Sequence, residues 1–145
     1  MILDQVSVYV WAIVIAWTSA HLVKYVIALS RGAQLNFSKQ VFVSGGMPSA
    51  HMSTVMALWA VILLTDGVTS GLFGIMTLFA LIVAHDAVRV RRSSGEQGVV
   101  LIELMKASKS KLGFPRVSKG HSIPEVVVGA IFGTLVGIVV FFIAQ

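Results

Sequence analysis

The sequence contains no cysteine and very little charge. None of its 145 residues is Cys, and only 12% are Asp, Glu, Lys or Arg. The absence of cysteine excludes a disulfide framework and a thiolate metal site. Soluble globular domains usually have about a quarter of their residues charged. A chain that is 57% hydrophobic and so sparsely charged is predicted to be a single integral membrane domain that occupies residues 1–145.

The beginning of the chain also lacks the basic region of a secretory signal peptide, because Asp4 is the single charge within residues 1–10. The first apolar run is therefore predicted to be a mature transmembrane helix. A spanning helix needs roughly 20 apolar residues, and four runs approach that length: residues 6–29, 48–64, 70–84 and 123–144. The second and third runs are short, so they would tilt, extend into polar neighbours or lie inside protein. We expect an all-α bundle of about four transmembrane helices.

Lysine and arginine are missing from alternate connections of this bundle. None precedes the first run or lies in the turn around Asp66, whereas many lie within residues 31–39 and 89–119. The positive-inside rule then predicts a multi-pass protein of the cell (inner) membrane with cytoplasmic basic loops and both termini outside. Basic loops also attract anionic lipids, so membrane lipids are expected partners. Aromatic residues do not alternate with the basic ones, which argues against nucleic acid as a partner.

Glycine, proline and amphipathic patterns indicate where the helices begin, end and pack. Pro48 follows paired glycines and suits the first turn of the second helix, and Asp66 with Gly67 forms a turn that closes it. Residues 97–105 combine an apolar face with a polar one, which predicts a short interfacial helix at the membrane surface. Gly129 and Gly133 form a small-xxx-small face for helix packing. Four short helices bury little surface, so a homodimer would complete the bundle.

Five polar residues fall at one predicted membrane depth, on the basic side: Lys24, His51, Asp86, His121 and Glu125. Ionisable residues near membrane spans are costly to bury and usually face a protein interior or an aqueous cavity. Each has a structural interpretation when taken singly. Lys24 would snorkel to the interface, Asp86 would pair with Arg89, and His51 would be a hydrogen-bonded core residue. Their convergence instead predicts a polar functional site, with Asp86 as an accessory residue.

The residues around this group predict phosphate chemistry. Gly45, Gly46 and Ser49 supply backbone and hydroxyl donors that lead into a helix N-terminus, where the helix dipole attracts anions. Three arginines offer forked donors for phosphoryl oxygens: Arg91, Arg92 and Arg116. These positive charges would do the electrostatic work, so no metal or other cofactor is expected.

Two histidines supply candidate catalytic groups. His121 and Glu125 are four residues apart, so on a helix the carboxylate would hold one imidazole nitrogen and raise the nucleophilicity of the other. His51 would protonate a leaving oxygen as a general acid. Together with Asp86, the same residues leave a His/Asp/Glu metal site open as an alternative.

Three motifs resemble the divergent branch of the type 2 phosphatidic acid phosphatases, a superfamily that includes vanadium-dependent haloperoxidases. They are Ser44 to His51, Asp86 to Gln97, and Gly120 to Gly129. The resemblance implies a helical membrane bundle and a metal-independent phosphatase that forms a phosphohistidine. By position, it implies that His121 is the nucleophile, Glu125 its orienting carboxylate in place of the usual aspartate, and His51 the general acid. It also implies that Gly46 and Ser49 bind phosphate and that Lys24 matches the lysine of the first motif.

The chain departs from the family pattern in its first and third motifs. The Arg-Pro pair expected after Lys24 is missing, and Pro115 stands where the third motif has arginine, so Arg116 or the Arg91–Arg92 pair would substitute. The expected function is hydrolysis of a lipid phosphate monoester or diphosphate, namely phosphatidic acid, phosphatidylglycerol phosphate or an isoprenoid phosphate. The alternative is a non-catalytic lipid-phosphate binder or transporter that has lost turnover. A proton or ion pathway would leave the glycine–serine segment unexplained.

Overall fold

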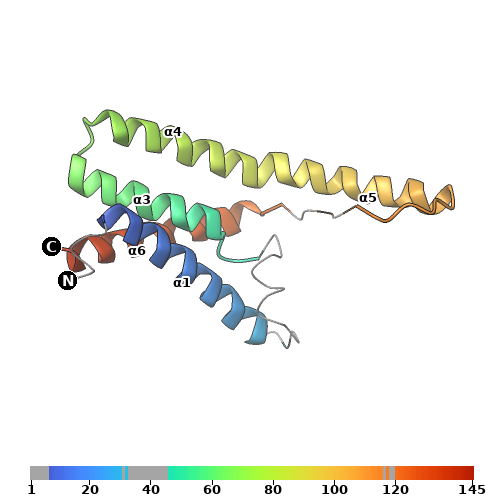
Figure 1. Cartoon of the computed structure of the whole chain (residues 1–145), viewed down its shortest axis with the longest axis horizontal. Coiled ribbons are helices and arrows are strands. Elements are labelled where there is room, and N and C mark those ends of the chain that lie inside the picture. Colours follow the sequence, from blue (N-terminus) through green and yellow to red (C-terminus); the bar gives the residue numbers. More distant parts are fainter. Residues whose placement is uncertain (1–6, 31, 33–45, 116, 118–119) are drawn as a thin grey trace.

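The computed structural model describes residues 7–30, 32, 46–115, 117 and 120–145, and these residues form a helical bundle with a projecting arm (Figure 1). The elements in chain order are α1 (Val8–Ser30), α3 (Ala50–Asp66), α4 (Gly71–His85), the π-helical turn η2 (Asp86–Val90), α5 (Arg91–Ala107) and α6 (Ile123–Ile143). The four predicted apolar helices are confirmed, each within two residues of its predicted bounds. No strand occurs in the part of the chain that the structure describes.

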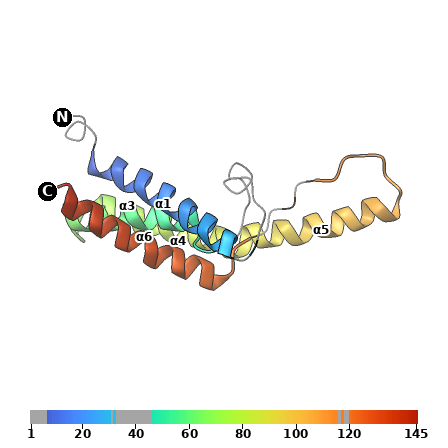
Figure 2. The same cartoon turned by 90° about the horizontal axis from the view of Figure 1, so that it is seen from below.

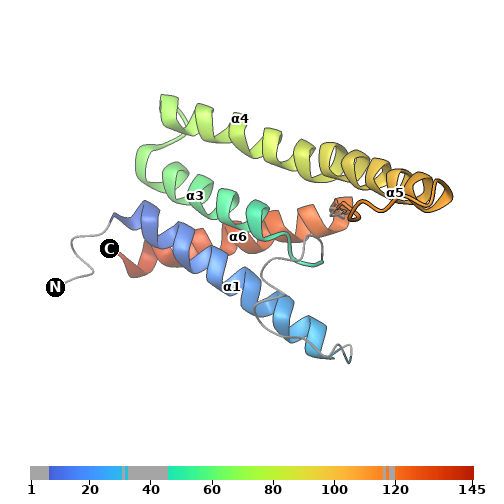
Figure 3. The same ribbon diagram turned by 45° about the vertical axis from the view of Figure 1, so that its right-hand side comes forward.

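Helix α3 is the centre of the bundle and packs against α1, α4 and α6. Figures 1 and 3 show α3 between α4 on one side and α1 on the other. Helix α1, the joined helix Gly71–Ala107 and α6 are each long and apolar enough to cross a membrane, whereas α3 has only 17 residues. Its length need not match the bilayer because neighbouring helices cover it. This is one of the arrangements expected for a short run.

Large apolar side chains cover the outside of the bundle. In a soluble protein such extensive apolar exposure would promote aggregation, but it suits helices that contact lipid. The residues that are more than half exposed include Ile75, Leu78, Leu81, Ile131, Leu135 and Phe142. Many of the buried residues are instead small, chiefly alanine, glycine and serine, and these allow the helix backbones to approach closely.

The contact between α3 and α6 shows how close that approach is. Every fourth residue of α6 from Gly129 to Gly137 is a buried glycine that faces the backbone of α3; the pairs are Gly129 with Ser49, Gly133 with Ser53, and Gly137 with Ala57. A Cβ atom at Gly129 would lie 2.8 Å from the carbonyl oxygen of Ser49, and at Gly133 or Gly137 it would lie closer still to α3. The predicted small-xxx-small packing is confirmed and extends one turn further.

Helix α1 buries a stripe with the same spacing but made of alanine. Its buried residues are Ala12, Ala16, Ala20 and Lys24, which are four apart and therefore share one face. Lys24 thus continues an inward stripe, and it is only 7% exposed. The snorkelling interpretation of Lys24 is therefore wrong, because its side chain points into the bundle.

Helices α4 and α5 are joined end to end into one helix of 37 residues that projects beyond the bundle (Figure 2). At the junction, the N–H of Arg91 donates to the carbonyl oxygen of Asp86, five residues earlier, which is the bonding pattern of a π-helical turn. A helix does cover residues 97–105 as predicted, but it is part of this longer helix and not a separate short one. The chain then returns along α5, where Val117 contacts Gly98.

Chain direction alternates among α1, α3, α4 and α6, so polar residues from different helices meet at one end. At the opposite end, the Tyr9 hydroxyl donates to the Asp66 carboxylate at 2.7 Å and ties the start of α1 to the end of α3. At the polar end, the Ser49 N–H donates to the Glu125 carbonyl oxygen at 3.2 Å, which ties the starts of α3 and α6 together.

Candidate active site

His121 lies in the short segment before α6 and is held by its backbone. Its N–H donates to the carbonyl oxygen of Ala87, in the π-helical turn, at 3.0 Å. Such turns recur at functional sites because they redirect backbone groups out of the regular helical pattern. The imidazole is 6% exposed. This bond fixes the depth at which the histidine enters the bundle.

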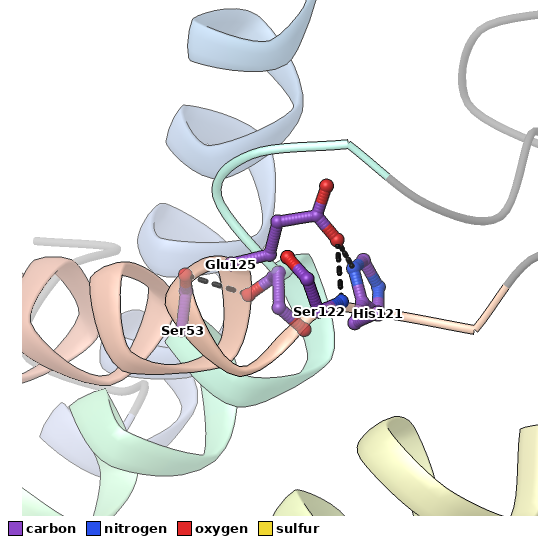
Figure 4. A network of polar contacts seen from close by, with 5 residues as sticks. Ser53, His121, Ser122 and Glu125 are labelled. Carbon is purple, nitrogen blue, oxygen red and sulfur yellow. Dashed lines mark hydrogen bonds and ion pairs between the residues drawn. The ribbon is translucent and has the colours of Figure 1, made fainter. Parts of the chain in front are cut away.

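The predicted contact between His121 and Glu125 is present (Figure 4). Nδ1 of His121 lies 3.1 Å from Oε2 of Glu125, and the same oxygen accepts the Ser122 N–H at 3.0 Å. The two residues do not share a helix, because α6 begins at Ile123 and the Glu125 side chain turns back over its first turn as in a capping box. A carboxylate accepts, so Nδ1 carries the proton and Nε2 keeps its lone pair.

Burial and charged neighbours together determine the protonation of His121. Burial lowers the pKa of the imidazole below its ordinary value, and the positive charges of Lys24 and Arg91 act in the same direction. Glu125 opposes this shift through its hydrogen bond and its charge. The imidazole is therefore neutral near pH 7, which is the form that can attack phosphorus.

Several of the other predicted residues lie near this histidine. His51, in the first turn of α3, lies within electrostatic range of Lys24, Asp86, Arg91 and His121. Lys24 is also within range of Glu125. Side chains from α1, α3, η2, α5 and the segment before α6 thus converge on one place, as their common predicted depth required.

Two neighbouring arginines point in different directions. Arg91 Nε contacts Asp86 Oδ2 at 2.7 Å, so the interpretation that paired Asp86 with Arg89 is wrong. This ion pair uses one of the five guanidinium donors, and Arg91 reaches the same groove as His51. Arg92 instead contacts Glu96 at 3.2 Å, and these two side chains are 68% and 69% exposed. The structure brings Arg91 into the site and places Arg92 at the surface of α5.

The predicted phosphate loop is described from Gly46 onward; Gly45 and Arg116 lie outside the described residues. Gly46 has a φ of 83°, and a Cβ atom there would lie 3.7 Å from Lys24 Cε. Ser49 is completely buried between α3 and α6. Its hydroxyl has no hydrogen-bond partner among the residues described. An unsatisfied buried hydroxyl costs about 1–3 kcal/mol, so it needs an explanation beyond packing.

A groove of about 320 Å³ leads away from the polar residues. His51, Asp86 and Arg91 line one part of it, and the remaining wall comes from Trp17, Thr54, Val55, Phe79 and Val83. Sequence reasoning missed Trp17 and Phe79, since aromatic residues are ordinary in membrane helices and no pattern marked these two.

Sequence reasoning also missed His21. It stacks on Trp17 with ring centroids 4.4 Å apart and lies within electrostatic range of Lys24 and His51. Its buried Nδ1 has no partner within the described ranges. The signal that could have found it is its position three residues before Lys24, which places both on neighbouring parts of one helix face.

The alternative metal site is not formed. It required His51, Asp86, His121 and Glu125 to converge as ligands, and all four are described. No three His, Asp or Glu side chains among the described residues are close enough together to hold a metal ion.

Comparisons with known proteins show the family to which the chain belongs. The model of the family described as "Divergent PAP2 family" matches residues 6–136. The chain is also 31% identical over 138 residues to the uncharacterized membrane protein YuiD of Bacillus subtilis strain 168, a match that covers 85% of this chain and 87% of that protein. No solved structure matches. The apolar helices, the polar end of the bundle and the extent of the family match lead to one conclusion: this chain is a membrane protein that belongs to the Divergent PAP2 family.

Proposed function

We propose that the chain is a lipid-phosphate phosphatase that hydrolyses a phosphate monoester or diphosphate through a phosphohistidine. The observation that carries the proposal is the buried imidazole of His121, whose Nδ1 is held by Glu125 while Lys24 and Arg91 stand within electrostatic range. A neutral, oriented imidazole among cations suits attack on an anionic phosphoryl group. The substrate candidates are phosphatidic acid, phosphatidylglycerol phosphate and isoprenoid phosphates.

In the first step, Nε2 of His121 attacks phosphorus, and the bond between phosphorus and the ester oxygen breaks. His51 donates a proton to the departing oxygen, so the lipid leaves as an alcohol, or as a monophosphate when the substrate is a diphosphate. Lys24 and Arg91 balance the negative charge on the phosphoryl oxygens. Glu125 stabilises the positive charge that His121 acquires.

In the second step, water attacks the phosphohistidine, and the bond between phosphorus and Nε2 breaks. His51, now neutral, accepts a proton from the water, and inorganic phosphate leaves. Both histidines then return to their starting protonation states. No redox partner or additional reactant is required.

The proposed site opens to the cytoplasm, with both ends of the chain on the outer side of the cell membrane. Lys106, Lys109 and Lys111 follow from the polar end of the bundle, and basic segments stay on the cytoplasmic side. Because the chain has no cysteine, single Cys residues introduced at Lys109 and at Val68 can be labelled in intact cells. Labelling of Val68→Cys but not Lys109→Cys by an impermeant reagent is expected, and the reverse pattern would contradict this orientation.

The decisive experiment measures phosphate release from the three substrate classes by the purified full chain in lipid nanodiscs. His121→Ala should reduce release by at least about a hundredfold. The matched control is His85→Ala, an exposed histidine at the end of α4, which should leave the rate unchanged. Equal rates for His121→Ala and the unaltered protein would refute the proposal.

The alternative function is a non-catalytic lipid-phosphate binder, and the presence of Pro115 in place of the third-motif arginine favours it. Trapping a phosphoenzyme separates the two functions. A phosphohistidine is labile to acid and stable to alkali. Brief incubation with labelled substrate should give such a species in the His85→Ala control and none in His121→Ala. Tight binding of lipid phosphate without a phosphoenzyme or release would favour the binder.

A further inference from the structure

The groove that His51 lines also has a largely apolar part. Trp17 on α1 and Phe79 on α4 form its facing walls, and Thr54 on α3 forms part of its floor. One cavity is therefore lined both by two of the residues proposed to act on phosphate, His51 and Arg91, and by a hydrocarbon-like surface. This combination indicates a ligand with a charged head and an apolar chain.

The groove lies open at the side of the bundle. Helix α1 packs against α3 and α6, whereas α4 packs against α3 and η2. Figures 1 and 3 show α1 and α4 on opposite sides of α3. Trp17 and Phe79 are 44% and 47% exposed. In a membrane these half-exposed rings face lipid, and a chain would move sideways from the bilayer into the groove.

The volume limits the chain that fits. At about 320 Å³ the groove is at the small end of ligand sites. A water molecule occupies about 30 Å³ in the liquid, and a methylene group is of similar size, so the groove holds about ten methylene groups. Two chains side by side would each place only about five methylene groups in the groove, so this volume fits one chain segment better than two. Because bulk lipid is as apolar as the groove, the groove selects by shape and orientation instead of adding net hydrophobic affinity.

We propose that this groove is the chain-binding subsite, and that the substrate is a single-chain lipid phosphate whose chain lies over α3 between Trp17 and Phe79. The proposal rests on the proposed function for the identity of the head group. Chain placement would bring the phosphorus to His51 and Arg91 in a fixed orientation, which raises the rate for the correct lipid.

Photo-crosslinking tests the subsite without requiring turnover. An alkyl phosphate with a diazirine in its chain is irradiated with the full chain in nanodiscs, and crosslinked residues are identified by mass spectrometry. We expect crosslinks on Trp17 and Phe79 that excess unlabelled alkyl phosphate removes and the corresponding alcohol does not. Crosslinks spread over the lipid-facing side of α6, around Phe142, or equal competition by the alcohol would overturn the proposal.

Filling the groove supplies the matched variant. Thr54→Trp places a large ring in the groove, and the Thr54 hydroxyl bonds only within its own helix, to the Ala50 carbonyl oxygen at 2.9 Å. Leu64→Trp on the same helix is the control, because Leu64 does not line the groove. Thr54→Trp should abolish the competed crosslinks and Leu64→Trp should keep them, with thermal unfolding showing that both fold. If Thr54→Trp does not fold, Phe79→Ala tests the same question because it removes one wall of the groove. Leu78→Ala is then its control.

Turnover then tests chain selectivity. For the unaltered protein, kcat/KM should be higher for a single-chain lipid phosphate than for a two-chain lipid with the same phosphate group. Thr54→Trp should lower the ratio of kcat/KM for the single-chain lipid over a soluble aryl phosphate by about tenfold, and Leu64→Trp should not change it. Equal rates for one and two chains would refute the single-chain assignment. Failure of every phosphate ester to react would refute the phosphatase, while crosslinking still decides the groove.

Discussion

Replacing Gly129 by alanine should damage the site without touching a catalytic group. Gly129 lies one turn after Glu125 on α6 and packs on the backbone of Ser49, two residues before His51. An alanine Cβ would stand 2.8 Å from the Ser49 carbonyl oxygen, 3.0 Å from its nitrogen and 3.1 Å from its Cβ. All three neighbours are backbone or backbone-attached atoms, so no side chain can rotate away. The starts of α3 and α6 must separate.

The size of that separation sets the expected effect. Ordinary van der Waals contact needs the helices to part by about 0.5 Å, and a gap of that size forfeits roughly a quarter of the contact energy nearby. Overpacking of this kind costs about 1–3 kcal/mol, against a gain of about 0.5–1 kcal/mol from replacing a helical glycine. A misplacement of catalytic groups by about 1 Å can lower the rate a hundredfold. A displacement of about 0.5 Å should therefore lower the rate of phosphate release by roughly tenfold.

The assay pairs thermal unfolding in detergent with phosphate release in nanodiscs. Gly74→Ala is the control, because a Cβ at this α4 glycine meets nothing within 4 Å and should change neither the rate nor the packing. Gly129→Ala should unfold at a lower temperature than Gly74→Ala and release phosphate more slowly. If the two variants matched in both measurements, the close contact of α3 and α6 would not position the site.

Three further substitutions test the electrostatics of the site. Glu125→Gln removes the carboxylate that favours protonated His121, so the pKa of His121 should fall further below its ordinary value of about 6.5. The acidic limb of the pH profile of kcat/KM should then move to lower pH. An acidic limb that does not move would contradict this role of Glu125. Arg91→Ala should lower kcat/KM about a hundredfold while the exposed Arg92→Ala changes it little, and equal losses would show that both reach phosphate. Ser49→Ala removes a buried hydroxyl without a partner, so it should increase the free energy of unfolding by about 1 kcal/mol and raise the unfolding temperature, while phosphate release becomes slower. A lower unfolding temperature would mean that the hydroxyl has a partner.

The helices were predictable because lipid imposes a strong pattern. Apolar runs bounded by Pro48, Gly67 and Ser70 indicated the helix ends to within two residues. Alternating charge then predicted alternating direction, which is why Lys24 and His121 meet although they are distant in sequence. Gly129 and Gly133 similarly predicted a packing face, since only small residues allow backbones so close.

The details of the site depended on features without a sequence pattern. A regular helix places Asp86 beside residues three and four further on, which favoured Arg89. The π-helical turn adds a residue to the turn, rotates the following helix and brings Arg91 to Asp86 instead. Arg92 instead contacts Glu96, one turn further along α5. The groove needs side chains from α1, α3 and α4 together, so no single run of sequence could indicate it.

The shortness of α3 also affects how many membrane crossings are assigned to the chain. By length and hydropathy alone, three of the described helices could cross a membrane, and α3 is shorter than these. An odd number would put the beginning of α1 and the end of α6 on opposite faces of the membrane. In the bundle these two ends lie at the same end (Figure 1). Under the proposed orientation, reporter proteins fused before α1 and after α6 would share one compartment, which requires α3 to cross the membrane although it is short.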